Sequence, residues 1–238
     1  MAEGVKVVSE ALVAGVRVEA VFAAPGAPAE LLDRAAAAGA RVHELAPGVL
    51  ERVAGTVTPQ PVIATVPYLD VELDALRSAD LVVVCVDVRD PGNAGTVLRS
   101  AEAAGAGGVI FCSGCVDVYN PKAVRASAGS LFHVPVVSGG DAVDVLGRVG
   151  GWGLRRLGAV AGRGSDYTAA DLVGPTALVL GNEASGLPPS VAAGGLDGEI
   201  TIPMSGRAES LNVGMAAAVL CFEAARQRRA RRELASAT

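Results

Sequence analysis

The fold class is decided by Asp80–Val88, DLVVVCVDV, an almost unbroken run of apolar, mostly β-branched residues. Such a run is typical of a strand buried on both faces, as in a parallel sheet covered by helices. Further strand patterns cover residues 107–112, 154–162, 176–181 and 199–203. Helical patterns and loops separate these strands, so we predict an α/β fold whose parallel sheet carries helices on both faces.

The first part of the chain repeats this alternation on a smaller scale. Helical patterns cover residues 3–15 and 27–39, and strand patterns cover 18–24, 41–45 and 61–66. A charged and weakly apolar segment follows. We therefore expect a small α/β domain over residues 1–67, a linker over 68–79 and a larger domain over 80–238.

The composition fits this architecture. Hydrophobic residues make up 51% of the chain and aromatic residues only 3%, which suits close helix–sheet packing. Charge or glycine interrupts every apolar stretch before it reaches membrane-spanning length. Glu3, Glu10 and Glu19 lie where a signal peptide would need an apolar core. A cytoplasmic protein without a membrane partner is expected.

The charge balance gives mixed information about a nucleic-acid partner. The net charge is −5, whereas proteins that bind nucleic acids usually carry a basic surface. The distribution of charge matters more than its sum, and the run Arg226–Arg232, RQRRARR, is strongly basic. These arginines could contact RNA, or they could form a solvated helix end where cations interact favourably with the helix dipole. Both interpretations stay open.

The cysteines do not predict a metal or redox site. Cys112 and Cys115 form a CxxC pair, but no second pair and no nearby histidine completes a tetrahedral ligand set. The pair follows a strand rather than opening a helix. Cys85 and Cys221 lie in apolar runs and are expected to be buried as small hydrophobic residues.

The first candidate loop, DPGNAG, follows the strand that ends near Val88. Its proline and glycines predict a tight strand-to-helix turn, with Asn93 as the helix cap. Arg99 would lie on the first or second turn of that helix, where its guanidinium could reach back over the loop. An ordinary capped turn with a surface arginine would explain the same pattern.

Two further loops follow strands nearer the end of the chain. In GNEASGL, which begins at Gly181, glycine lets the backbone approach a ligand closely. The third loop is IPMSGRAESLNV, which begins at Ile202. The last helix is expected to begin at about Ser210, and Ser210 and Asn212 are suited to cap it. The chain contains neither the GxGxxG of nicotinamide dinucleotide sites nor a P-loop. Loops after parallel strands meet at one sheet edge, so we expect the three loops to share a crevice.

Together the three loops resemble the signature motifs of the SpoU (TrmH-like) family of RNA 2′-O-ribose methyltransferases, within the SPOUT superfamily. The resemblance covers about Asp80 to Arg229 and rests on Asn93 with Arg99, on GNEASGL and on IPMSGRAESLNV. The intervening VYNPKAVRASAGSLFHVPV is also similar to the family. Residues 1–67 resemble, more loosely, the ribosomal-protein-like RNA-binding domain that many members carry.

The resemblance implies a fold, a cofactor and partners. The C-terminal chain would form a deep trefoil knot, an exception to the usual unknotted topology. S-adenosyl-L-methionine would bind in that knot, and the chain would work as a homodimer whose last helix lies partly in the interface. The RNA substrate would be ribosomal or transfer RNA, of which ribosomal RNA is favoured. The implied cofactor-binding residues are Leu180, Gly181, Ile202, Met204, Ser210 and Leu211.

The resemblance also implies the catalytic residues, namely Arg99, Asn93, Glu183, Ser210 and Asn212. In the family, the arginine is the proposed acceptor of the 2′-proton. A neutral arginine at pH 7 costs roughly 7 kcal/mol, so a cation that clamps phosphate and stabilises the developing alkoxide is the alternative role. The two histidines, His43 and His133, are expected to be structural.

Two other functions compete with this one. A noncatalytic RNA-binding module could retain the methyltransferase fold without turnover, although the joint presence of all five implied catalytic residues argues against it. A Rossmann-type oxidoreductase is disfavoured because the dinucleotide fingerprint is missing.

Overall fold

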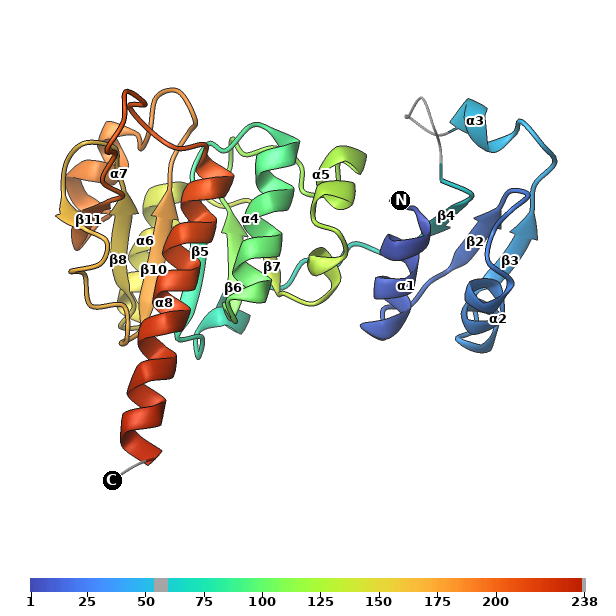
Figure 1. The fold of residues 1–238 in the computed structure, drawn as a ribbon, viewed down its shortest axis with the longest axis horizontal. Helices are drawn as coiled ribbons and strands as arrows, with labels where there is room; N and C mark the ends of the chain where they lie inside the picture. Colours follow the sequence, from blue (N-terminus) through green and yellow to red (C-terminus); the bar gives the residue numbers. More distant parts are fainter. Residues whose placement is uncertain (54–59, 237–238) are drawn as a thin grey trace.

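The chain is divided between two β-sheets. The computed structural model describes residues 1–53 and 60–236, and Figure 1 shows the smaller sheet at the N-terminal end of the molecule beside the larger one. In the part of the chain that the structure describes, no helix has the length and apolar character needed to cross a bilayer.

The N-terminal sheet is mixed, with strand order β1-β4-β2-β3. Its strands are β1 (Ala2–Glu3), β2 (Ala20–Ala23), β3 (Arg41–Glu44) and β4 (Val62–Thr65). Its helices are α1 (Val5–Val13), α2 (Ala29–Ala37) and the short α3 (Leu50–Val53). Strand β4 runs antiparallel to both neighbours, while β2 and β3 are parallel. The hydrophobic periodicity of the sequence predicted α1, α2 and the strands β2, β3 and β4. Elements β1 and α3 are too short to show a hydrophobic period.

The second sheet has seven parallel strands in the order β7-β6-β5-β10-β8-β11-β9. The strands are β5 (Leu81–Cys85), β6 (Gly108–Phe111), β7 (Val136–Ser138), β8 (Arg155–Ala159), β9 (Ser165–Asp166), β10 (Thr176–Leu180) and β11 (Gly198–Thr201). The two central strands, β5 and β10, are buried along their whole length. The parallel sheet predicted from the apolar runs is confirmed.

Helices cover both faces of this sheet, as predicted. One face carries α4 (Pro91–Ala103), α5 (Pro121–Ala126) and α8 (Val213–Ser236), and the other carries α6 (Ala142–Gly151) and α7 (Pro189–Gly194). Alternate residues of β5 point to opposite faces, so Val83 packs in the cluster that includes α4 and α8, and Val84 packs with α6. Short 3-10 helices occupy Leu73–Leu76 (η1) and Ser130–Phe132 (η2).

The starts of two helices differ from the prediction. Helix α4 begins at Pro91, inside the expected loop, because the carboxylate of Asp90 accepts a hydrogen bond from the backbone N–H of Asn93 at 2.9 Å. Asp90 is therefore the cap and Asn93 is not, and Arg99 falls on the third turn. Helix α8 begins at Val213 rather than near Ser210, because the cap is Asn212.

The segment expected to be the linker, one ion pair and one side-chain hydrogen bond hold the N-terminal part against the larger sheet. The backbone N–H of Val71 donates to the carbonyl of Val136 at 2.9 Å, so the linker runs beside β7. Arg125 lies 2.8 Å from the buried Glu3, and His133 lies 3.0 Å from Glu10. These contacts join α5 and η2 to β1 and α1.

Candidate functional site

The three loops chosen from the sequence meet at the carboxyl end of the large sheet. The amide nitrogen of Asn93, on α4, donates to Oε1 of Glu183 at 2.9 Å. The amide nitrogen of Asn212, just before α8, donates to the side-chain oxygen of Asn93 at 2.8 Å. Three of the five implied catalytic residues, from distant parts of the chain, therefore form one hydrogen-bonded relay, the Glu183–Asn93–Asn212 relay.

The direction of each hydrogen bond in the relay follows from the contacts that Asn212 makes with the start of α8. Oδ1 of Asn212 accepts from the backbone N–H groups of Gly214 and Met215, at 2.9 and 3.3 Å. The amide nitrogen of Asn212 must then face Asn93, whose oxygen accepts and whose nitrogen donates to Glu183. The relay thus ends on a carboxylate that acts only as an acceptor.

The relay allows a prediction about stability. Asn93→Asp would set a second carboxylate beside Glu183, where the present N···O distance is 2.9 Å. Two carboxylates so close cannot both ionise freely, so we expect a loss of about 2 kcal/mol in the free energy of unfolding at pH 7. The loss should shrink towards pH 5, because the shared proton restores a hydrogen bond. Urea unfolding at both pH values measures it.

Asn93→Ala is the matched control, since it removes the hydrogen bonds without adding a charge. Its loss of stability should be nearly the same at both pH values. If the loss in Asn93→Asp were also independent of pH, the two carboxylates would not interact and the relay would be wrong.

The second loop is held in a tight turn by its own backbone and by Asn182. Oδ1 of Asn182 accepts from the backbone of Ala184 at 2.9 Å, and its amide nitrogen donates to the carbonyl of Asp87 at 2.9 Å. Gly181 lies so close to the returning chain that a Cβ there would be 2.4 Å from the carbonyl carbon of Gly186. Only glycine fits this position, and the turn leaves backbone groups beside the cavity next to it.

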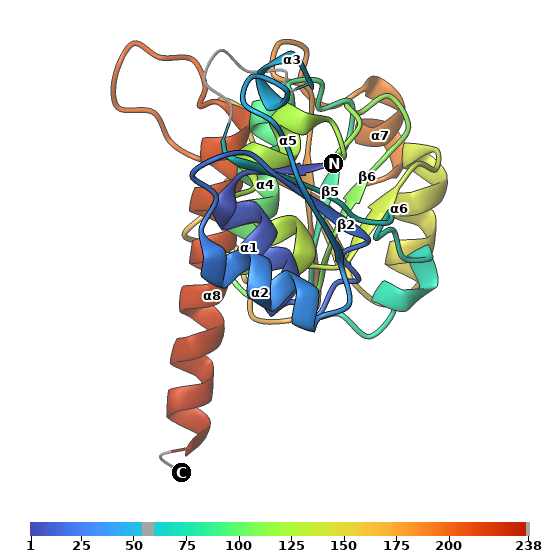
Figure 2. The same ribbon diagram turned by 90° about the vertical axis from the view of Figure 1, so that its right-hand side faces the viewer.

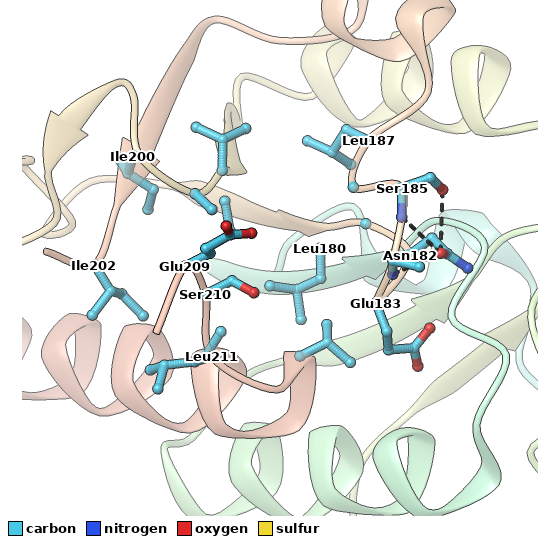
Figure 3. A pocket seen from close by; sticks show the side chains of 18 of the residues that line it. Leu180, Asn182, Glu183, Ser185, Leu187, Ile200, Ile202, Glu209, Ser210 and Leu211 are labelled. Carbon is cyan, nitrogen blue, oxygen red and sulfur yellow. Dashed lines mark hydrogen bonds between the residues drawn. The ribbon is translucent and has the colours of Figure 1, made fainter. Parts of the chain in front are cut away.

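A cavity of about 400 Å³ lies between the second and third loops (Figure 3). This volume is within the roughly 300–1,000 Å³ typical of small-molecule sites. Apolar side chains meet backbone groups and a few polar side chains in its wall, including Glu183 and Glu209. All six residues implied in cofactor binding line the cavity: Leu180, Gly181, Ile202, Met204, Ser210 and Leu211.

Arg99 and Ser210, the other two implied catalytic residues, do not take part in the relay. Ser210 lines the cavity but does not cap α8. Arg99 is exposed on α4 and is not part of the cavity wall. Asn93, Thr96 and Arg99 follow at a spacing of three along α4, and Thr96 packs against Gly214 of α8. Within residues 1–53 and 60–236, no hydrogen bond or ion pair involves the side chain of Arg99.

The thiols beneath the first loop are part of the core. The thiol of Cys115 accepts from the backbone N–H of Val88 and donates to the carbonyl of Cys85, both at 3.3 Å. Burial raises the pKa of Cys112 to about 12, so this thiol is protonated at neutral pH. Among the described residues, no group of three or more His, Cys, Asp or Glu side chains is arranged to hold a metal ion.

Residues outside the sequence prediction also shape the site. Asp90 caps α4, and the hydrogen bond from the backbone of Asn93 lowers the pKa of its carboxyl. The Asp-Pro pair at 90–91 is a known helix-start signal that identifies this cap. Arg163 lines the cavity and forms a bidentate pair with Glu199 at 2.9 and 3.0 Å. No motif in the sequence points to Arg163.

Comparisons with known proteins give matches over both parts of the chain. Residues 80–222 match the model described as SpoU rRNA Methylase family, and residues 1–70 match RNA 2′-O ribose methyltransferase substrate binding. The 23S rRNA (uridine(2479)-2′-O)-methyltransferase of Streptomyces viridochromogenes is 39% identical over 71% of this chain and 61% of its own length, so the match spans less than two thirds of that relative. RlmP of Bacillus subtilis, a 23S rRNA (guanosine(2553)-2′-O)-methyltransferase, is 34% identical over 77% of this chain and 72% of its own length.

Solved structures agree with these matches. The SpoU methyltransferase AviRb from Streptomyces viridochromogenes, in complex with the cofactor AdoMet, is 30% identical with a TM-score of 0.83. That likeness covers 96% of this chain and 90% of the other. The AdoMet-bound rRNA methyltransferase from Sinorhizobium meliloti is 31% identical with a TM-score of 0.80, over 94% of this chain and 86% of the other.

Proposed function

The chain belongs to the SpoU rRNA methylase family, and from this premise we propose that it methylates a ribose 2′-hydroxyl in ribosomal RNA. It is an RNA 2′-O-ribose methyltransferase whose methyl donor is S-adenosyl-L-methionine. The observation that carries this proposal is the Glu183–Asn93–Asn212 relay beside a cavity of cofactor size. Ribosomal RNA is the substrate of the two named relatives.

The volume of the cavity and several of the residues that line it suit this cofactor. Leu180, Ile202 and Leu211 supply apolar surface for a purine ring, while the turn at Gly181 leaves backbone groups close to the ligand. Met204 and Ser210 complete the wall. The carboxylates of Glu183 and Glu209 suit the positive charge of a sulfonium ligand. When bound, the cofactor supplies an activated methyl group.

Arg99 acts in this proposal as a cation on the RNA side of the site. A Cβ on a helix points towards the N-terminus, so the side chain of Arg99 leans along α4 towards Asn93. A guanidinium there can bind the phosphate next to the target ribose and stabilise negative charge that develops on its 2′-oxygen. Accepting the 2′-proton would require the neutral form, at a cost of roughly 7 kcal/mol at pH 7.

We propose that the two parts of the chain, each built on one sheet, have separate functions. Residues 1–67 bind the RNA substrate, 68–79 form the linker and 80–238 carry the reaction. We propose that the segment that leads from Ile202 into α8 forms the deep trefoil knot that the family resemblance implies. This segment and the loop at Gly181 line the same cavity. A crystal structure traced through this region tests the crossing.

Labelled S-adenosyl-L-methionine and ribosomal RNA from cells that lack the gene test the activity. We expect methyl groups at one ribose, mapped by resistance of its 3′ phosphodiester bond to alkali. Transfer RNA from the same cells is the comparison substrate. Binding of ribosomal RNA without any incorporation would instead identify a noncatalytic RNA-binding module.

Helix α8 offers a surface for a second copy of this chain. Met215 and Phe222 are 59% and 53% exposed, and their spacing of seven places them on one face of the helix. Leu211, which lines the cavity, is 39% exposed and lies two residues before the helix begins. We propose that this face forms a homodimer interface beside the site.

Met215→Glu combined with Phe222→Glu is expected to convert the dimer to a monomer. Each substitution would place an unpaired carboxylate in an apolar interface, so the dissociation constant should rise at least about 100-fold. Sedimentation velocity over a range of concentrations measures the change. Val13→Glu, at a 65% exposed apolar residue of α1, is the matched control and should remain dimeric. A double variant that also remains dimeric would exclude this face.

A further inference from the structure

Aromatic side chains gather at the junction of the two sheets. The chain has only four Phe, three Tyr and one Trp, yet Tyr68, Tyr119 and Phe132 line a single cavity of about 220 Å³. Asp117 also lies in its wall. The cavity is smaller than the roughly 300–1,000 Å³ of sites for drug-sized ligands, so it suits one flat ring better than a whole nucleotide cofactor.

Tyr68 is held in place but left uncovered. Its side chain is 77% exposed and meets Tyr119 edge to face, with ring centroids 4.7 Å apart. The next residue, Leu69, donates its backbone N–H to the hydroxyl of Tyr119 at 2.8 Å. The linker therefore presents an aromatic ring from a fixed backbone, and such a ring can stack on a ligand at little entropic cost.

The chain segment that lines this cavity leads towards the relay. The side chain of Lys122, at the start of α5, lies 3.5 Å from the carboxylate of Asp90, which in turn caps the helix at Asn93. Tyr119 precedes α5 by two residues, in the loop that follows β6. Figure 1 shows α5 between α4 and the N-terminal end of the chain, and Figure 2 shows the same region with the N-terminal helices α1 and α2 facing the viewer. The loop after β6 therefore lines the cavity and leads into α5, whose Lys122 contacts the residue that caps α4.

We propose that this cavity binds an unpaired base of the RNA substrate, next to the nucleotide that is methylated. The inference rests on the proposed function, which supplies the RNA. Unpaired bases are recognised by stacking on aromatic side chains and by hydrogen bonds to their edges. The carboxylate of Asp117 disfavours a phosphate in the cavity but can accept a hydrogen bond from a base amino group. Lys122 does not line the cavity, so its ammonium group can contact the phosphate backbone of the RNA.

Three variants of Tyr68 separate stacking from simple packing. Tyr68→Phe retains the aromatic ring, Tyr68→Leu retains bulk without it, and Tyr68→Ala removes both. With ribosomal RNA from cells lacking the gene, Ala and Leu should raise KM and the RNA dissociation constant about tenfold, as expected for one lost stack. The Phe variant should match the wild type. For all three, kcat and the dissociation constant for S-adenosyl-L-methionine should stay unchanged.

The salt dependence of RNA binding gives a second measurement. A lost stack removes no phosphate contact, so the slope of log K against log salt should be the same in all variants. Full affinity in Tyr68→Leu, or an unchanged KM in Tyr68→Ala, would overturn the base-binding cavity while leaving the methyltransferase intact. Wild-type protein that does not methylate ribosomal RNA would instead overturn the proposed function.

Discussion

Arg99→Ala is expected to slow methyl transfer about 10²–10³-fold, the usual effect of removing one preorganised group that stabilises developing charge. The guanidinium would act on the RNA phosphate and the 2′-oxygen, and Arg99 does not line the cavity that we propose for the cofactor. The dissociation constant for S-adenosyl-L-methionine should therefore change less than about threefold. Single-turnover transfer and calorimetric titration of the cofactor measure the two quantities separately.

Two further arginine variants sharpen this prediction. Arg99→Lys retains a positive charge but loses the forked geometry, so it should recover only part of the rate. Arg89→Ala removes an exposed arginine at the same sheet edge, paired with Asp87 at 2.7 Å, and should have little effect. Methyl transfer at the wild-type rate in Arg99→Ala would reject any role for this residue in the reaction.

Gly181→Ala is expected to weaken cofactor binding by at least about 100-fold, or 2.7 kcal/mol. The added Cβ would lie 2.4 and 2.6 Å from the carbonyl atoms of Gly186 and 2.6 Å from the backbone nitrogen of Leu187. These neighbours are backbone atoms, so the loop itself must move. Movement would displace the cavity wall and Glu183 together.

Gly147→Ala is the control for this substitution. Gly147 lies within α6 and has open space where a Cβ would be, so alanine there should stabilise the helix by up to about 1 kcal/mol. Thermal unfolding shows whether Gly181→Ala remains folded when its cofactor binding is measured. Wild-type affinity in a folded Gly181→Ala protein would mean that the loop does not form the cofactor site.

The amino-acid sequence was sufficient to predict most of the fold, because the buried strands have unmistakable apolar runs. Both misplaced helix starts have one cause, namely competition between side chains for the cap. Asp90 takes the position that we expected for Asn93, and Asn212 caps α8, which begins at Val213, three residues after the expected start near Ser210. Strand β9 and helix α5 are too short to show a period.

The candidate site was predictable as a set of residues but not as a geometry. Motifs identified Asn93, Glu183 and Asn212, yet they contain no information on which side chain donates to which. That order depends on backbone N–H groups of α8 that lie beyond the motif residues themselves. Tyr68 was inconspicuous in the sequence, because its partner Tyr119 belongs to a distant segment of the chain.

The side chain of Asn212 hydrogen-bonds to the first turn of α8 and to Asn93, so it connects the start of α8 to the Glu183–Asn93–Asn212 relay. The backbone N–H groups of Gly214 and Met215 donate to Oδ1 of Asn212, and the amide nitrogen of the same side chain donates to Asn93. The rate of hydrogen–deuterium exchange at these two amides would therefore report on whether the relay is intact. The measurement needs neither substrate nor turnover. A disturbance at Glu183 or Asn93 should accelerate that exchange before any larger unfolding of the helix.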